Sequence, residues 1–147
     1  MITTEKWNKW KQQGSISLWH YEGFPKNICG YHLTSDQAGC EFLLGLTELF
    51  RNAEYPAQKK IILDAPTSAR LAVPGCPGKC VPAARLELRF LSTACDEHWT
   101  VNESDGEVII EMGASSLKDL ERGIRDITLG QGDWSIGNGR KSLWFWW

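Results

Sequence analysis

The final seven residues, KSLWFWW, constrain the fold of this chain more than any other stretch. In a β-strand, successive side chains point to opposite faces, so Leu143, Phe145 and Trp147 would share one face of a sheet. Trp144 and Trp146 would share the other face. Because an exposed edge strand with two apolar faces promotes aggregation, we expect this strand to lie inside a sheet with both faces covered. A homo-oligomer that buries the Trp144 and Trp146 face against a second copy is the alternative.

Length and composition indicate a single globular domain over residues 1–147, long enough to bury one hydrophobic core. Hydrophobic residues make up 42% of the chain and charged residues 23%, as in ordinary globular proteins. No window approaches the roughly eighteen apolar residues that a membrane span needs, and MITTEKWNKWKQQG lacks the apolar core of a secretion signal. With five cysteines, an odd number, we expect reduced thiols and a cytoplasmic protein.

Periodicity predicts two main helices and several strands. In residues 34–50 the apolar side chains fall on one helical stripe, and Thr34 and Gln37 have the spacing of a capping box. A second helix is predicted over 115–129, and a short one over 4–13. Strands are predicted at 15–21, 28–33, 59–66 and 85–91, in a hairpin over 98–112 that turns at Asp105-Gly106, and in a terminal pair joined at Asn138-Gly139.

The order strand, helix, strand occurs twice, in residues 28–64 and 107–136. This repetition favours an α+β fold, with a largely antiparallel sheet and two main helices packed on one of its faces. Ferredoxin-like halves with added strands are one option. Between the halves, residues 66–83 contain four prolines and two cysteines, and we expect a loop there.

Charge is distributed unevenly along the chain. Between residues 95 and 117 there are six acidic residues and no lysine or arginine, although the net charge of the whole chain is only −2. Such a stretch would attract a basic partner and repel nucleic acid, or it would simply form a solvated face. The candidate partner-binding residues are Asp96, Glu97, Glu103, Asp105, Glu107 and Glu111.

Two short pairs of metal-ligating residues give a second candidate site. Cys76 and Cys80 lie in CPGKC, and Cys95 and His98 lie in CDEH. Zinc takes four thiolate or imidazole ligands, which small domains often supply as two pairs from separate segments. A Cys76–Cys80 disulfide and buried structural thiols are the alternatives. If zinc or a small ligand binds, we expect its pocket under the Pro/Cys-rich loop.

Two stretches, GFPKNICGYHLTSDQAGCEFLLGL and GDWSIGNGRKSLWFWW, resemble small bacterial proteins of the immunity or accessory type found with polymorphic toxins. The resemblance covers about a third of the chain and carries no catalytic motif. It implies a non-catalytic protein that neutralises a toxin by protein–protein interaction. The alternative is a small-ligand or zinc-binding module, or an enzyme. No nucleic acid or membrane partner is expected.

Overall fold

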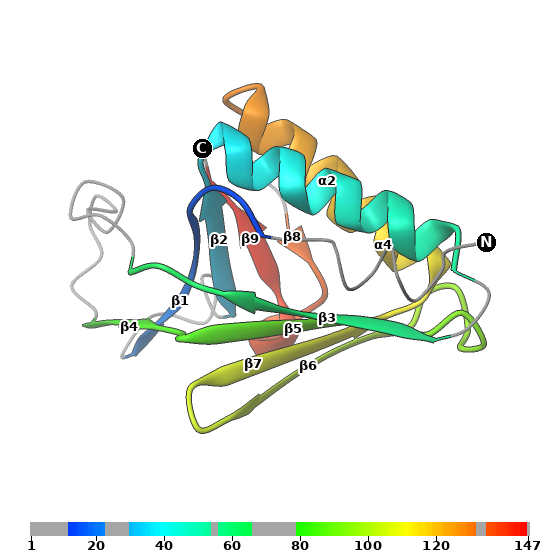
Figure 1. The fold of residues 1–147 in the computed structure, drawn as a ribbon. Coiled ribbons are helices and arrows are strands. Elements are labelled where there is room, and N and C mark those ends of the chain that lie inside the picture. The colour runs from blue at the N-terminus through cyan, green and yellow to red at the C-terminus, as the bar shows by residue number, and fades with distance from the viewer. Residues whose placement is uncertain (1–11, 23–29, 54–55, 66–78, 132–134, 147) are drawn as a thin grey trace.

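A computed structural model describes residues 12–22, 30–53, 56–65, 79–131 and 135–146 (Figure 1). Within these residues two sheets meet at an angle, and two helices lie across them on one side (Figure 1). The α+β class predicted from the sequence is confirmed, and both main helices cover the same side. The strands, however, are divided between two sheets where we expected one. The helix predicted over 4–13 lies outside the described residues.

Within the described residues, sheet A has five strands in the order β4-β1-β2-β9-β8, and sheet B has four in the order β3-β5-β7-β6. The strands of sheet A are β4 (Lys79–Pro82), β1 (Ile16–Glu22), β2 (Tyr31–Ser35), β9 (Leu143–Phe145) and β8 (Ser135–Ile136). Those of sheet B are β3 (Ala57–Ile62), β5 (Arg85–Phe90), β7 (Glu107–Met112) and β6 (Trp99–Ser104). The helices are α2 (Gln37–Arg51) and α4 (Ala114–Thr128), and a 3₁₀ turn, η2 (Gly139–Lys141), precedes β9.

The two halves of the chain repeat one ββαββ unit. The hairpin β1–β2 leads through α2 to β3 and β5 in the other sheet, and the hairpin β6–β7 leads through α4 to β8 and β9. In each sheet the hairpin of one unit pairs in parallel with the last strand of the other, β2 with β9 and β7 with β5. The two units are therefore interlocked, and their strands pair in the same order. This order differs from that of a ferredoxin-like fold, whose strands form a single sheet.

Helix α2 begins two residues later than its sequence suggested. Asp36 is the N-cap, and its carboxylate accepts a hydrogen bond from the Gly39 backbone N–H at 2.8 Å. The capping box predicted from Thr34 and Gln37 is therefore wrong: Thr34 lies in β2 and donates its hydroxyl to the carbonyl of Trp146 at 2.9 Å. At Gly39 a Cβ atom would lie 2.1 Å from Ser35 Oγ, so only glycine permits the close packing of α2 at this point.

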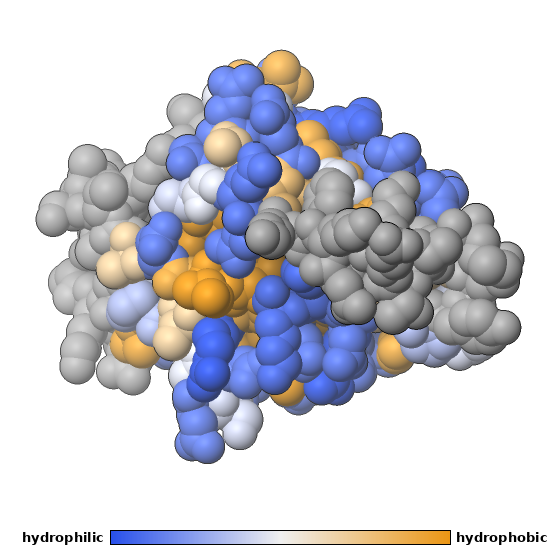
Figure 2. Space-filling view, in the orientation of Figure 1, coloured by the Kyte–Doolittle hydropathy of each residue, from blue (hydrophilic) through white to orange (hydrophobic). Residues whose placement is uncertain are grey.

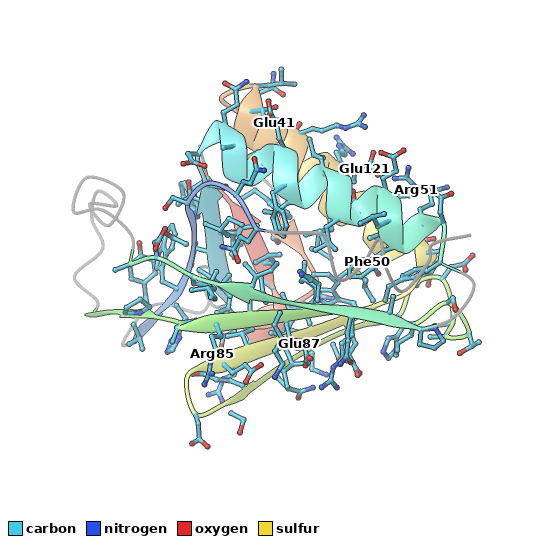
Figure 3. The ribbon with its side chains drawn as sticks, viewed as in Figure 1. Glu41, Phe50, Arg51, Arg85, Glu87 and Glu121 are labelled. Atoms are coloured by element: carbon cyan, nitrogen blue, oxygen red, sulfur yellow. The ribbon has the colours of Figure 1, made fainter. Side chains whose placement is uncertain are left out.

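The hydrophobic core lies between the helices and the inner faces of both sheets. The predicted stripe of α2 is buried, and Phe50 points from the helix toward sheet B (Figure 3), where its ring stacks on Phe90 at 6.1 Å. Hydrophobic side chains of α4 such as Leu117 and Leu120 are likewise buried. Arg85 and Glu87 of β5 point away from the helices (Figure 3). Alternation along each strand thus separates an apolar inner face from a polar outer face in sheet B.

The C-terminal strand occupies an internal position, as its sequence predicted. β9 lies between β2 and β8, and Leu143 and Phe145 are buried in the core. On the outer face Trp144 and Trp146 are each half-buried, and Trp147 lies outside the described residues. Burial of Trp144 and Trp146 against a second copy stays a prediction.

The loop region and the surface complete the fold. β4 forms at the end of the Pro/Cys-rich segment, where we expected a loop, and it pairs with β1 at the edge of sheet A. Figure 2 shows that hydrophilic residues dominate the visible surface, with an apolar area near its centre. In the described part of the chain Ile62 and Leu129 are the large hydrophobic residues that are strongly exposed. Neither described helix is long and apolar enough to cross a membrane.

Candidate functional site

The six predicted acidic residues lie at two ends of the β6–β7 hairpin rather than in one patch. Asp96 and Glu97 lie in the loop before β6, and Asp105 lies in the turn between β6 and β7. The strand between them is six residues long, which corresponds to about 17 Å at the rise of a β-strand. The predicted turn at Asp105-Gly106 is confirmed, with a positive φ at both positions.

Two of the six carboxylates, those of Glu103 and Glu111, have partners within the molecule. Glu103 accepts a hydrogen bond from the Tyr31 hydroxyl and so connects the two sheets. Burial, followed by this hydrogen bond and the Glu103 charge, raises the pKa of Tyr31 well above its ordinary value. Glu111 lies 3.4 Å from Arg89 and accepts from the Thr100 hydroxyl at 3.2 Å.

Glu107 stands opposite Arg85 in the register of the parallel pair β5–β7, on the outer face of sheet B. On the same face Arg89 also binds Glu87 at 2.7 Å, and hydrogen bonding to Glu87 raises the pKa of the Arg89 guanidinium. Acidic and basic residues therefore alternate on this face. Consequently Asp96, Glu97 and Asp105 are the more available of the six carboxylates, and all three are exposed.

A hollow of about 370 Å³ lies at the Asp96 and Glu97 end of the hairpin. The loop before β6, the first turns of α4 and the β8–η2 segment surround it. Its lining includes two carboxylates, an indole, two hydroxyls, an amide and one lysine, from Glu97, Asp119, Trp99, Ser115, Ser116, Asn138 and Lys141, together with Ile136 and Gly137. We call this the β6–α4 hollow. Asp119 was not predicted as a site residue, although it lies three residues after Ser116 and so shares its helix face.

Local contacts hold the wall of the β6–α4 hollow in place. The Trp99 indole N–H donates to the carbonyl of Lys141 at 2.7 Å, which joins β6 to η2. At Gly137, φ is +81° and a Cβ atom would lie 2.8 Å from Trp99 Nε1, so glycine permits this close approach. The carbonyl of Asp96 accepts from the backbone N–H groups of Ser115 and Ser116 at 2.8 and 3.3 Å, which caps α4.

The structure separates Cys80 from the other two predicted zinc ligands that it describes, Cys95 and His98. Cys80 belongs to β4, whereas Cys95 and His98 belong to the β5–β6 loop, and these two segments lie at opposite ends of the molecule (Figure 1). Cys76, and with it most of the proposed pocket under the Pro/Cys-rich loop, lies outside the described residues. Among described residues, no three His, Cys, Asp or Glu side chains form a metal-binding group.

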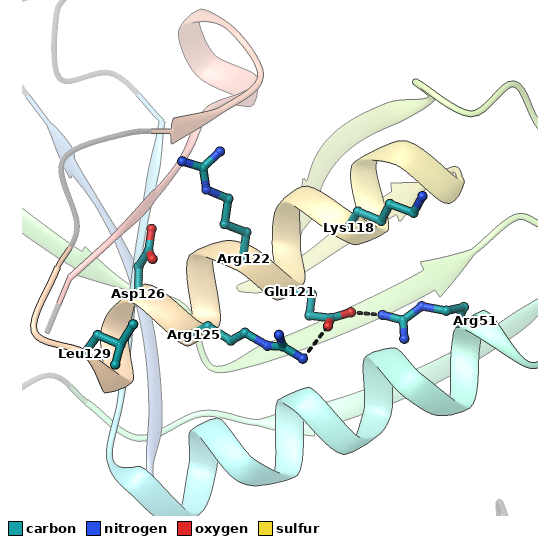
Figure 4. A pocket seen from close by; sticks show the side chains of 7 residues that line it. All are labelled: Arg51, Lys118, Glu121, Arg122, Arg125, Asp126 and Leu129. Carbon is teal, nitrogen blue, oxygen red and sulfur yellow. Dashed lines mark ion pairs between the residues drawn. The ribbon is translucent and has the colours of Figure 1, made fainter.

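A second hollow, of about 470 Å³, lies between the two helices (Figure 4). Its central carboxylate, Glu121, contacts Arg51 of α2 and binds Arg125 at 2.7 Å (Figure 4). Lys118 and Arg122 add further positive charge to its lining. Glu121 thus serves to connect the helices, and the surroundings are basic rather than acidic.

Sequence reasoning also missed the role of a buried histidine on the outer face of sheet A. His32 is 2% exposed, and its Nδ1 accepts a hydrogen bond from Trp146 Nε1 at 2.7 Å. Its ring lies between those of Trp19 and Trp144, with centroids 5.8 and 6.5 Å away. The alternating aromatic residues of SISLWHY and SLWFWW were the signal for such a layer. Comparison of the chain with protein-family models, with curated proteins and with solved structures found no match.

Proposed function

We propose that this chain is a non-catalytic binding protein that neutralises a basic protein partner, a toxin domain, as immunity-type proteins do. The observation that carries the proposal is the pair of exposed carboxylates that line the β6–α4 hollow, Glu97 and Asp119, with the exposed Asp96 next to Glu97 in the chain. Two segments of the sequence resemble immunity or accessory proteins, and this resemblance supports the same function. Complementary charge would guide a basic partner to this end of the molecule and speed association.

The position of these carboxylates also supports the proposal. Within the described residues β6 is an edge strand of sheet B, so the surface beside it is open to a partner. Charged residues at a sheet edge often serve only to prevent pairing with other strands. That role would not require a hollow beside them. The combination of exposed acids with a concave, partly aromatic surface is typical of a binding site.

The proposal is tested by titrating the protein with the product of the reading frame immediately upstream of its gene. We expect a complex whose association rate falls steeply as salt is added. Glu97→Lys should weaken the affinity by about tenfold, because it reverses a charge beside the partner. Co-expression with the same product should restore growth of cells that it otherwise poisons.

Glu41→Lys is the matched control, because Glu41 is an exposed acid on α2 and its reversal changes the net charge equally. Asp105→Lys reverses a charge at the turn end of the β6–β7 hairpin, away from the hollow. It should weaken the affinity less than Glu97→Lys does. Glu103 is unsuitable for reversal, since it binds Tyr31. Absence of a complex, or equal losses in Glu97→Lys and Glu41→Lys, would refute the proposal.

A further inference from the structure

We infer that the β6–α4 hollow receives the guanidinium group of an arginine side chain of the partner. This inference rests on the proposed function and specifies which chemical group the acidic surface recognises. Four features of the hollow support it: an aromatic wall, two carboxylates, a serine hydroxyl and a fixed backbone frame.

The aromatic wall is Trp99, whose orientation is set by its hydrogen bond to the Lys141 carbonyl. Because the indole N–H is already used in this bond, the ring rather than its N–H group is available to a ligand in the hollow. A planar guanidinium stacks on such a face more favourably than a hydrated ammonium does. Trp99 therefore favours arginine over lysine.

The two carboxylates are those of Glu97, in the loop before β6, and Asp119, in α4. Neither forms an ion pair or a side-chain hydrogen bond with another described residue, and both are exposed. Lys141 is the cation among the described lining residues, so the lining carries an excess of one negative charge. A guanidinium presents five N–H donors in a fixed fork, which allows it to bind two carboxylates at once.

A hydroxyl also lines the hollow, that of Ser116, a residue that is only 5% exposed. A hydroxyl oxygen can accept a hydrogen bond from an N–H donor that enters the hollow. Ser116 therefore adds a polar contact beside the two carboxylates.

The hollow between the helices provides an internal contrast. There Glu121 already has Arg51 and Arg125 as partners, which are the kind of ligand that we assign to the β6–α4 hollow (Figure 4). In the hollow between the helices, one carboxylate thus has two guanidinium partners. In the β6–α4 hollow, two carboxylates have no guanidinium partner among the described residues. The second arrangement is the one that can accept an arginine from outside.

The experiment uses the full chain and three blocked pentapeptides, with arginine, lysine or citrulline between glycines. Citrulline has nearly the shape of arginine but no charge. Binding is followed by NMR through the Trp99 indole N–H, which is identified by its loss in Trp99→Phe. We expect the arginine peptide to shift this resonance to saturation, the lysine peptide to bind more weakly and the citrulline peptide to cause no saturable shift.

Glu97→Gln with Asp119→Asn should lower the affinity for the arginine peptide by at least about tenfold, since two charged hydrogen bonds become neutral. The other resonances should keep their positions, because both side chains are exposed. Glu41→Gln is the matched control and should bind normally. Equal binding of the citrulline or lysine peptide, or unchanged affinity in the double variant, would overturn the inference.

The peptide experiment and the partner titration fail independently. A salt-dependent complex that is weakened by Glu97→Lys, together with no arginine binding, would refute the inference and leave the proposed function intact. Saturable binding of the arginine peptide without any complex with the upstream gene product would refute the proposed function. It would leave the hollow as an arginine-binding site.

Discussion

The outer faces of the two sheets share one backbone arrangement and differ completely in chemistry. Counted back from the last residue of each strand, His32 of β2 corresponds to Ile109 of β7. Their partners across the parallel pairs are Trp144 and Glu87, so the aromatic residues of β9 occupy the positions of the charged residues of β5. Trp146 corresponds in the same way to Arg89.

This comparison shows that strand order and register leave the outer face of a sheet free to vary. Sheet A buries His32 among the rings of Trp19 and Trp146, and the Trp146 indole donates a hydrogen bond to it. Sheet B buries Glu87 at 3% exposure beside Arg89, and its bonds are ion pairs. We therefore expect sheet A to contribute more to stability and sheet B to respond more to salt, because ion pairs are screened and ring packing is not.

Removal of residues 144–147 should have the largest effect, because it breaks sheet A at an internal strand. Loss of Phe145 alone costs about 3–5 kcal/mol, against a total stability of about 5–15 kcal/mol for a domain of this size. We expect the truncated chain to show no cooperative thermal transition by near-UV circular dichroism. Trp144→Phe, which keeps the strand, is the control and should still melt cooperatively.

Trp146→Phe tests the aromatic face without removing the strand. The substitution keeps a ring but leaves His32 Nδ1 without the indole N–H, which should cost about 1–3 kcal/mol in urea unfolding. Trp144→Phe leaves this hydrogen bond in place and should cost less. If the two substitutions cost the same, the Trp146–His32 bond does not stabilise sheet A in the way we describe.

Arg89→Met tests the equivalent position of sheet B. It removes the partner of Glu87, but Lys60 stands opposite Glu87 in the neighbouring strand and remains available. The expected loss in the free energy of unfolding is about 1 kcal/mol, and it should shrink as salt is added. A loss that is independent of salt, like that expected of Trp146→Phe, would remove the distinction between the two faces.

Tyr31 links the sheets, and its titration gives the smallest predicted effect. Because burial and Glu103 raise the pKa of the folded hydroxyl, the unfolded chain loses this proton first, near pH 10. The stabilising contribution is thus fully present below about pH 10 and is lost as pH rises toward the folded pKa. Tyr31→Phe should therefore show a shallower fall in stability above pH 10, measured by urea unfolding at several pH values. Identical slopes would contradict this account.

Local sequence patterns predicted much of the fold. The apolar stripes of both helices, the hairpin over 98–112 and the internal position of the last strand depend on periodicity and turn residues near one another in sequence. The division into two sheets could not be predicted in this way. It is set by pairings between distant segments, such as that of His32 with Trp144. The N-cap was assigned to the wrong residue because Thr34, a good cap, is held in β2 by its bond to Trp146.

The candidate site was predicted only in part. The acidic stretch included Glu97, which lines the β6–α4 hollow, but linear charge counting could not show that Asp105 lies at the other end of the hairpin. It also stopped before Asp119, which joins the site because α4 packs beside the start of β6. Whether a carboxylate is available depends on its neighbours in space, such as Arg89 beside Glu111.

The central claim is that this protein binds a basic partner through the β6–α4 hollow while sheet A supplies stability. The most direct measurement is a calorimetric titration of the upstream gene product into the Glu97→Gln, Asp119→Asn double variant, alongside its melting temperature. The account predicts an affinity at least about tenfold weaker and an unchanged melting temperature. An unchanged affinity would contradict it.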